Sequence, residues 1–287
     1  MILREPFLPP GWYPRQKEKI EDFLKPFKKA AKSQAGTQTS SGAKAAIAPH
    51  AGWYYSGPLA ALAVSSLEAE AETVVVIGGH LPRGMPVLSA REDGVKTPIG
   101  VMMIDRELRE AFDKRVSTSP DRYQDNTVEV LLPMAHYFFP DSKLLWLRLP
   151  SEMSSFEAGK ILAETAGKLG KRIVIISSTD LTHYGRNYGF SPKGMGKSAL
   201  EWVKKNNDAA FISAVLEGDP SVVLKRAEED YSACSAGAVL GALGFASLEG
   251  KSARLLDYST SADVAGDAID DDEIPDSFVG YAAISFG

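Results

Sequence analysis

The sequence predicts an α/β fold, in which a central, largely parallel or mixed β-sheet is flanked by helices. Short, nearly continuous apolar runs rich in β-branched residues alternate with amphipathic segments along the chain, and such runs are typical of strands buried on both faces. Because strands and helices alternate, crossover connections are needed, and these make neighbouring strands parallel. No repeat or break in composition divides the 287 residues, so we expect one domain spanning residues 1–287.

Six apolar runs predict strands, and six segments with a period near 3.6 residues predict helices. The strands are expected at 45–49, 73–79, 143–149, 172–178, 253–259 and 278–286. The helices are expected at 57–70, 105–115, 126–138, 154–170, 197–219 and 233–250, the third being interrupted by Pro133.

Two polar stretches predict flexible loops. Residues 32–44 are rich in Gly, Ser, Thr and Gln, and residues 261–277 are acidic and poor in large apolar side chains, so neither buries enough surface to offset the entropy of ordering it. The acidic run lacks the glycine and the spacing of a calcium loop. We therefore expect a solvated loop there.

Charge and cysteine content exclude several classes of protein. The formal net charge is −5, so no basic surface points to nucleic acid as a partner. Cys234 is the only cysteine, which excludes an intramolecular disulfide and favours a reducing, cytoplasmic setting. The first residues lack the unbroken apolar core of a signal peptide, and no later run has the length of a membrane span. We expect a cytoplasmic protein that contacts no membrane.

Common nucleotide and hydrolase motifs are absent. The chain contains no GxGxxG fingerprint, no GxxxxGK[ST] loop and no GxSxG elbow, so neither a nucleotide-dependent mechanism nor a serine hydrolase has support.

Three of the four histidines come at matching places in the predicted topology. His50 and His80 directly follow predicted strands, and His183 lies in the segment SSTDLTHYG just beyond a third. The carboxyl ends of parallel strands meet at one edge of the sheet, where ligands bind. One such histidine is more often structural, whereas three at equivalent positions favour a site. His136, at an apolar helix end, is expected in the core or at its rim.

A histidine cluster at a sheet edge suits metal binding, because imidazole binds iron, zinc and copper. Asp180, three residues before His183, is placed to bind the metal, to orient an imidazole or to cap a turn. Cys234 precedes a run of small residues, ACSAGAVLGAL. Near a helix N-terminus its thiol is a candidate ligand or nucleophile, although a small buried side chain explains it equally well.

Several motifs in one order resemble the Memo family, whose microbial members are called AmmeMemoRadiSam system protein B and whose animal members are mediators of ErbB2-driven cell motility. They are RxPFLPPGWYP (4–14), APHAGWYYSGPLAA (48–61), GGH (78–80), KTPIGVMMID (96–105), DNTVEVLLPMAHYFFP (125–140), SSTDLTHYG (177–185), Cys234 and FVGYAAISF (278–286).

The resemblance implies a fold similar to LigB-type class III extradiol dioxygenases. It also implies a metal held by His50, His80 and Cys234, with Asp180 and His183 as catalytic groups in the same pocket. Iron(II) is the metal it favours, with copper and zinc as alternatives.

Two positions depart from the family pattern. Asn126 stands where the family commonly has a pocket histidine, and Ser235 stands where a glycine usually follows the cysteine. Asparagine forms hydrogen bonds but does not shuttle protons near neutral pH.

Two kinds of function fit these residues. The first is a metal-dependent redox enzyme, dioxygenase-like, in which His183, held by Asp180, acts as acid and base. The second is a non-catalytic module that binds a small molecule or a peptide, as the resemblance to animal Memo proteins implies. The pocket would then be lined by Trp53, Tyr54, Tyr55, Asn126 and Tyr184. The family name further implies AMMECR-type and radical SAM proteins as partners.

Overall fold

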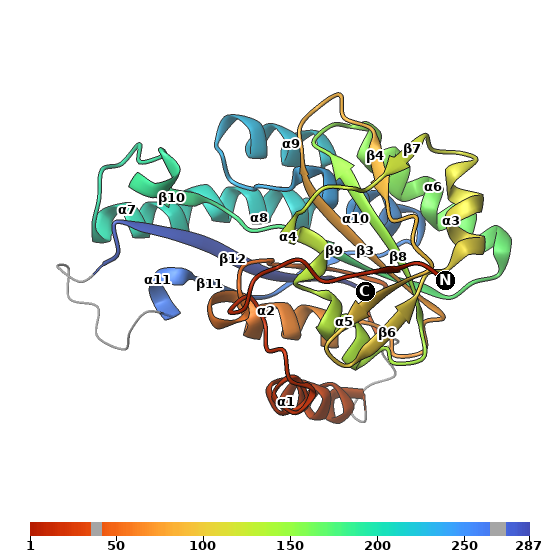
Figure 1. Ribbon diagram of the computed structural model, residues 1–287. Helices are drawn as coiled ribbons and strands as arrows, with labels where there is room; N and C mark the ends of the chain where they lie inside the picture. The colour runs from red at the N-terminus through yellow and green to blue at the C-terminus, as the bar shows by residue number, and fades with distance from the viewer. Residues whose placement is uncertain (36–41, 265–273) are drawn as a thin grey trace.

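The computed structural model describes residues 1–35, 42–264 and 274–287 and has helices on both faces of a large mixed sheet (Figure 1). This confirms the predicted α/β class. The strands are β1 (Leu3–Arg4), β2 (Ala45–Ala48), β3 (Thr73–Leu81), β4 (Val87–Ser89), β5 (Gly94–Thr97), β6 (Gly100–Met103), β7 (Thr118–Pro120), β8 (Lys143–Pro150), β9 (Ile173–Ser178), β10 (His183–Gly185), β11 (Ala253–Thr260) and β12 (Ser277–Phe286).

The helices begin and end as follows: α1 (Lys17–Ala35), α2 (Trp53–Ser65), α3 (Arg106–Asp113), α4 (Asn126–Glu129), α5 (Leu132–Phe138), α6 (Ser154–Leu169), α7 (Lys197–Trp202), α8 (Asp208–Glu217), α9 (Pro220–Glu229), α10 (Ala236–Leu248) and α11 (Ser261–Val264). A short 3₁₀-helix, η1, covers Arg186–Tyr188, and a π-helical turn, η2, covers Val203–Asn207 between α7 and α8. Within the described ranges, no helix combines the length and the apolar character needed to cross a bilayer.

The large sheet has a parallel centre. Its order is β10-β12-β2-β9-β3-β8-β4-β7, and β11 pairs with β12. Strands β2, β9, β3 and β8 run parallel, whereas β12 is antiparallel to β2 and β4 is antiparallel to β8. A separate small sheet joins β1, β5 and β6. The carboxyl ends of β2, β9 and β3 therefore lie side by side, as the sequence predicts.

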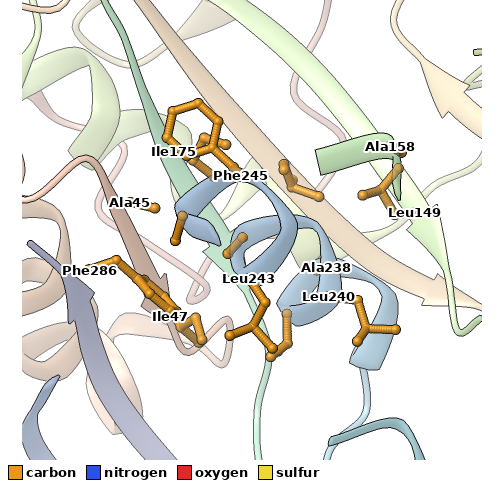
Figure 2. Close-up of a cluster of buried hydrophobic side chains, with 14 of the residues drawn as sticks. Ala45, Ile47, Leu149, Ala158, Ile175, Ala238, Leu240, Leu243, Phe245 and Phe286 are labelled. Atoms are coloured by element: carbon orange, nitrogen blue, oxygen red, sulfur yellow. The ribbon is translucent and has the colours of Figure 1, made fainter. Parts of the chain in front are cut away.

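Alternation along each strand divides the core into two layers. In β2, Ala45 and Ile47 join the layer under α6 and α10, while Ala46 and Ala48 join the layer under α2 and α5. Figure 2 shows the first layer, in which α10 lies against β2, β8 and β9. Its backbone packs tightly on α6, since a Cβ added at Gly244 would collide with the backbone of Phe156, and on the sheet, since a Cβ added at Gly241 would lie 2.6 Å from Cδ1 of Leu149. The small residues before and within α10 therefore fix where Cys234 lies.

Several predicted boundaries are wrong in detail. The helix predicted at 126–138 is two helices, α4 and α5, separated by Val130 and Leu131. The helix predicted at 233–250 begins at Ala236, so Cys234 precedes it, and the one predicted at 197–219 contains the π-helical turn η2. Strand β3 continues to Leu81, so His80 lies within it.

The two predicted loops are partly helical. Residues 32–35 belong to α1 and residues 261–264 form α11. The rest of each prediction falls largely on 36–41 and 265–273, outside the described residues. Helices α1 and α9 are absent from the sequence prediction, although Asp219 and Pro220 are typical first residues of a helix: the Asp219 carboxylate accepts hydrogen bonds from the backbone of Ser221 and Val222.

Candidate metal centre

The parallel register brings His50 and Asp180 to the same place at the sheet edge. Ala48 of β2 pairs with Ser178 of β9, and His50 and Asp180 each lie two residues beyond that pair. The backbone N–H of His50 donates to Oδ1 of Asp180 at 2.7 Å. The strand ends thus place an imidazole and a carboxylate together before any ligand binds.

His50, His80 and Cys234 form a compact group of potential metal ligands. Each offers one donor atom, and these atoms all lie within 4.8 Å of one another. Nε2 of His50 is 3.2 Å from Sγ of Cys234, and the two imidazole rings meet nearly edge to face, with centroids 4.9 Å apart. Two imidazoles and a thiol at this spacing suit zinc, copper or iron.

Cys234 is held beside the strand ends by its backbone. Its N–H donates to the carbonyl of Asp180 at 3.2 Å, and the next N–H, of Ser235, donates to Oγ1 of Thr179 at 3.2 Å. Because α10 is packed closely on α6 and the sheet, the thiol lies at a fixed position.

His50 is fixed on every side. It is only 1 % exposed, its Nδ1 lies 2.5 Å from Oγ of Ser178, and its carbonyl accepts a hydrogen bond from Nδ2 of Asn126 at 3.0 Å. With Nδ1 engaged, Nε2 is the nitrogen that faces Cys234. Asn126 therefore supports the backbone of His50 through its amide.

His80 has an unusual backbone and a charged partner. Its φ is +55°, a conformation that only strong surrounding contacts maintain in a residue other than glycine. Its Nδ1 donates to Oδ2 of Asp125 at 3.0 Å. Gly79 just before it approaches Ser235 so closely that an added Cβ would lie 2.4 Å from that side chain. Glycine is needed there for the strand end to reach the cysteine segment.

The charges of the cluster are strongly coupled. Burial raises the pKa of the Cys234 thiol, but the His50 charge and hydrogen bonds from both histidines outweigh burial and hold that pKa well below its usual value. Burial lowers the pKa of His80, but Asp125 and Cys234 raise it to about 10. Both shifts favour a thiolate and a protonated imidazole, so a cation that binds there competes with protons.

Burial also raises the pKa of the Asp180 carboxyl, and the negative charge of Cys234 acts in the same direction. The positive charges of His50 and His183 oppose this effect without cancelling it. Asp180 thus lies close enough to both histidines for their charges to change its pKa.

His183 is oriented by a backbone carbonyl. Its Nδ1 donates to the carbonyl of Leu181 at 3.1 Å, while Asp180 interacts with this histidine through its charge. The ring also meets Tyr188 edge to face, with centroids 4.9 Å apart. Since a carbonyl only accepts, the neutral ring carries its proton on Nδ1 and leaves the Nε2 lone pair free.

The aromatic residues predicted to line a pocket divide into two groups. Trp53 is 4 % exposed, and its Nε1–H donates to the carbonyl of Val130 at 2.9 Å. Tyr184 is fully buried, with its hydroxyl donating to the carbonyl of Gly194. These two side chains belong to the hydrophobic core. Tyr54 and Tyr55 are exposed, at 69 % and 46 %.

Further residues at the site carry only weak sequence signals. Ser178, Asp125 and Tyr188 contact the histidines, and Arg148 contacts Asp125. Arg148 interrupts an otherwise apolar strand, which is the one signal that a buried partner exists. His136 lies apart, its Nδ1 2.7 Å from Oγ1 of Thr97, at the rim as expected.

Comparison with known proteins agrees with the motifs. The family model described as Memo-like protein matches residues 4–285. A MEMO1 family protein of Methanosarcina mazei is 32% identical, and one of Archaeoglobus fulgidus is 30% identical; each alignment covers 99% of both chains. A crystal structure of an uncharacterized protein from Escherichia coli K12 superimposes with a TM-score of 0.43 and 15% identity, over 85% of this chain and 99% of that one. With a family match over almost its whole length, the chain belongs to the Memo family.

Proposed function

We propose that the protein binds one divalent metal ion, iron(II) in the first place, through His50, His80 and Cys234, and uses it in a redox reaction. The observation that carries the proposal is the convergence of two imidazole nitrogens and a thiol within 4.8 Å. Copper and zinc fit the same donors.

The residues around the three donors fit a metal. Ser178 and Asp125 engage Nδ1 of His50 and His80, which leaves the Nε2 atoms for coordination, and outer partners of this kind are usual for histidine ligands. The low thiol pKa favours the thiolate that a metal needs. With three protein ligands, an ion held here would keep positions open for substrate and oxygen and would supply one-electron chemistry.

Asp180 and His183 carry the proton chemistry in this proposal. The Nε2 lone pair of His183 is free to accept a proton from a substrate, because Leu181 fixes the proton on Nδ1. Asp180 stabilises the positive charge that results, since the two groups already interact electrostatically.

Metal content decides the first part of the proposal. Anaerobically purified protein is given iron(II), dialysed and analysed for bound iron. We expect about one equivalent, lost in His50→Ala and in Cys234→Ala but retained in His136→Ala, a matched control since that histidine lies at the rim. Iron retained in full by both site variants would refute the site.

The redox part is tested separately. Iron-loaded protein is mixed with oxygen and a panel of catechols, and oxygen uptake is followed. We expect His183→Gln to lower turnover by about 10²- to 10⁴-fold while leaving iron content unchanged. If no substrate of the panel causes oxygen uptake, the proposed redox reaction is contradicted.

A second candidate is a binding module, favoured by one observation. Tyr54 and Tyr55 are exposed with their rings edge to face at 5.0 Å, and the charge of Tyr55 contributes to raising the pKa of Tyr188, after burial and Asp180. Because Tyr188 contacts His183, Tyr55 lies near that end of the site, and together with Tyr54 it would contact a small molecule or peptide. Ligand binding that persists in His50→Ala and is lost in Tyr55→Ala would favour the module.

A further inference from the structure

The side chain of His80 is held by a chain of charged groups that ends at a buried arginine. Its Nδ1 contacts Oδ2 of Asp125 at 3.0 Å, and Nη2 of Arg148 lies 3.1 Å from the same oxygen. Arg148 is only 3 % exposed, and its Nε donates to the carbonyl of Gly79 at 3.0 Å. The guanidinium thus binds both the carboxylate and the backbone next to His80.

The other carboxylate oxygen of Asp125, Oδ1, accepts hydrogen bonds from helix α4. Oδ1 accepts from the backbone N–H of Thr127 at 2.9 Å and from its Oγ1 at 2.5 Å, and so caps helix α4. Oγ1 of Thr127 in turn accepts from the N–H of Gly79 at 3.2 Å. One oxygen is therefore committed to the helix and the other to His80.

We infer that Asp125 is a positioning residue for His80, held in place by Arg148, and that it aims the Nε2 lone pair of His80 at the site that Cys234 and His50 share. The inference rests on the proposed metal function for its role. The positive φ of His80 supports it, because a strained backbone persists only where contacts on both sides determine it.

The same geometry explains why an aspartate is required. An ionised carboxylate only accepts hydrogen bonds, so Nδ1 of His80 must carry the proton and Nε2 is left for a metal. Asparagine in the same orientation would place its NH₂ group where Oδ2 lies and would donate to Nδ1. The Nε2 atom of neutral His80 would then carry the proton and could not bind a metal.

The test uses Asp125→Asn, which keeps the size of the side chain and is a good helix cap. Cobalt(II) alone is the probe, because a thiolate-to-cobalt absorption band reports binding at Cys234. We expect the affinity to fall 10- to 100-fold, as is usual for outer partners of histidine ligands. Asp219→Asn is the matched control: it changes the same residue type at the cap of α9, far along the chain from the histidines, and should leave the affinity unchanged.

The same substitution made in the His80→Ala variant separates positioning of His80 from a general effect on the structure. If Asp125 acts through His80, the Asp125→Asn change causes no further loss of cobalt affinity in His80→Ala. An equal loss in both backgrounds, or wild-type affinity in Asp125→Asn, overturns the inference. Should Asp125→Asn fold poorly by circular dichroism, Asp125→Ser retains a cap and also removes the contact with His80, so it takes the same place in the test.

A measurement without metal distinguishes failure of the inference from failure of the metal site. Proton–nitrogen NMR of the metal-free protein should show the Nδ1–H of His80 as a slowly exchanging, downfield resonance that is lost in Asp125→Asn. If wild type binds no cobalt and the resonance behaves in this way, positioning stands and the metal function fails. A resonance unchanged by the substitution refutes positioning.

Discussion

Nε2 of His50 lies 3.2 Å from Sγ of Cys234, although 184 positions separate them in the sequence. This contact makes the single cysteine of the chain a direct probe of the site. Alkylation with iodoacetamide modifies one thiol only, so its rate reports on Cys234 without ambiguity.

We predict that zinc(II) slows alkylation of Cys234, because coordination to the metal lowers the nucleophilicity of the thiolate and blocks access to its sulfur. In metal-free protein, His50→Ala should also slow the reaction at pH 7, since the charge of His50 contributes to lowering the thiol pKa. Mass spectrometry of quenched samples gives both rates. Equal rates with and without zinc would contradict the proposed ligand.

Gly79→Ala should destabilise the fold and disturb the site. The new Cβ would lie 2.4 Å from the Ser235 side chain, and we expect a loss of about 1–3 kcal/mol from overpacking, measured by urea unfolding. Ser235→Gly should restore part of it by removing the clashing atoms. Gly167→Ala in α6 meets nothing within 4 Å and should instead stabilise by about 0.5–1 kcal/mol, which makes it the control.

Glu129→Ala should release the N-terminal segment. The Glu129 carboxylate accepts from the backbone N–H groups of Phe7 and Leu8 and from the hydroxyl of Tyr13. Each buried donor left unpaired costs about 1–3 kcal/mol. Hydrogen exchange at residues 7 and 8 should accelerate together with a fall in unfolding free energy, while exposed Glu157→Ala should change neither. Unchanged protection at residues 7 and 8 would contradict this role.

Asp208 should make stability fall as pH rises from about 4 to about 7. Burial raises the pKa of its carboxyl to about 7, although Thr182 and Tyr258 donate to it. The ordinary value in an unfolded chain is about 3.9, so the native state retains the proton more tightly. Its contribution is complete below pH 4 and is lost through pH 7, amounting to roughly 4 kcal/mol.

Asp208→Asn should remove that slope, because the amide does not ionise. Urea unfolding at intervals from pH 4 to pH 8 gives the free energies. The hydrogen bond from the Tyr258 hydroxyl favours the ionised carboxylate of Asp208. Tyr258→Phe removes this bond and raises the pKa of Asp208 further, so the decline in stability should extend to higher pH. A slope that persists in Asp208→Asn would assign it to another group.

The parallel centre of the fold was predictable because its strands are continuous apolar runs. The positions of the three histidines at one edge of the sheet were predictable because each lies at or just beyond the end of such a run. Helix α1 was not predicted because its amphipathic pattern is interrupted by Pro26, which the structure accommodates within the helix. The break between α4 and α5 and the π-helical turn before α8 depend on tertiary packing, which periodicity does not encode.

The site was less predictable than the fold. The place of Cys234 near a helix N-terminus made it a candidate ligand, but small-residue segments bury cysteines for packing equally well. The family resemblance is what favoured the ligand. The partner of His183 is a backbone carbonyl, which no side-chain pattern reveals. Trp53 and Tyr184 show that aromatic character suits a core and a pocket wall equally.

Strand β12 (Ser277–Phe286) follows β2 (Ala45–Ala48) by more than two hundred residues, yet it lies beside β2 inside the sheet, between β2 and β11. During synthesis, β2 therefore remains without this neighbour until residues 277–286 have left the ribosome. Pairing over such a separation is a slow step in folding. Until residues 277–286 have been made, His50 stands at the end of a strand with one side unpaired, so this edge of the candidate metal centre is completed only after β12 pairs with β2.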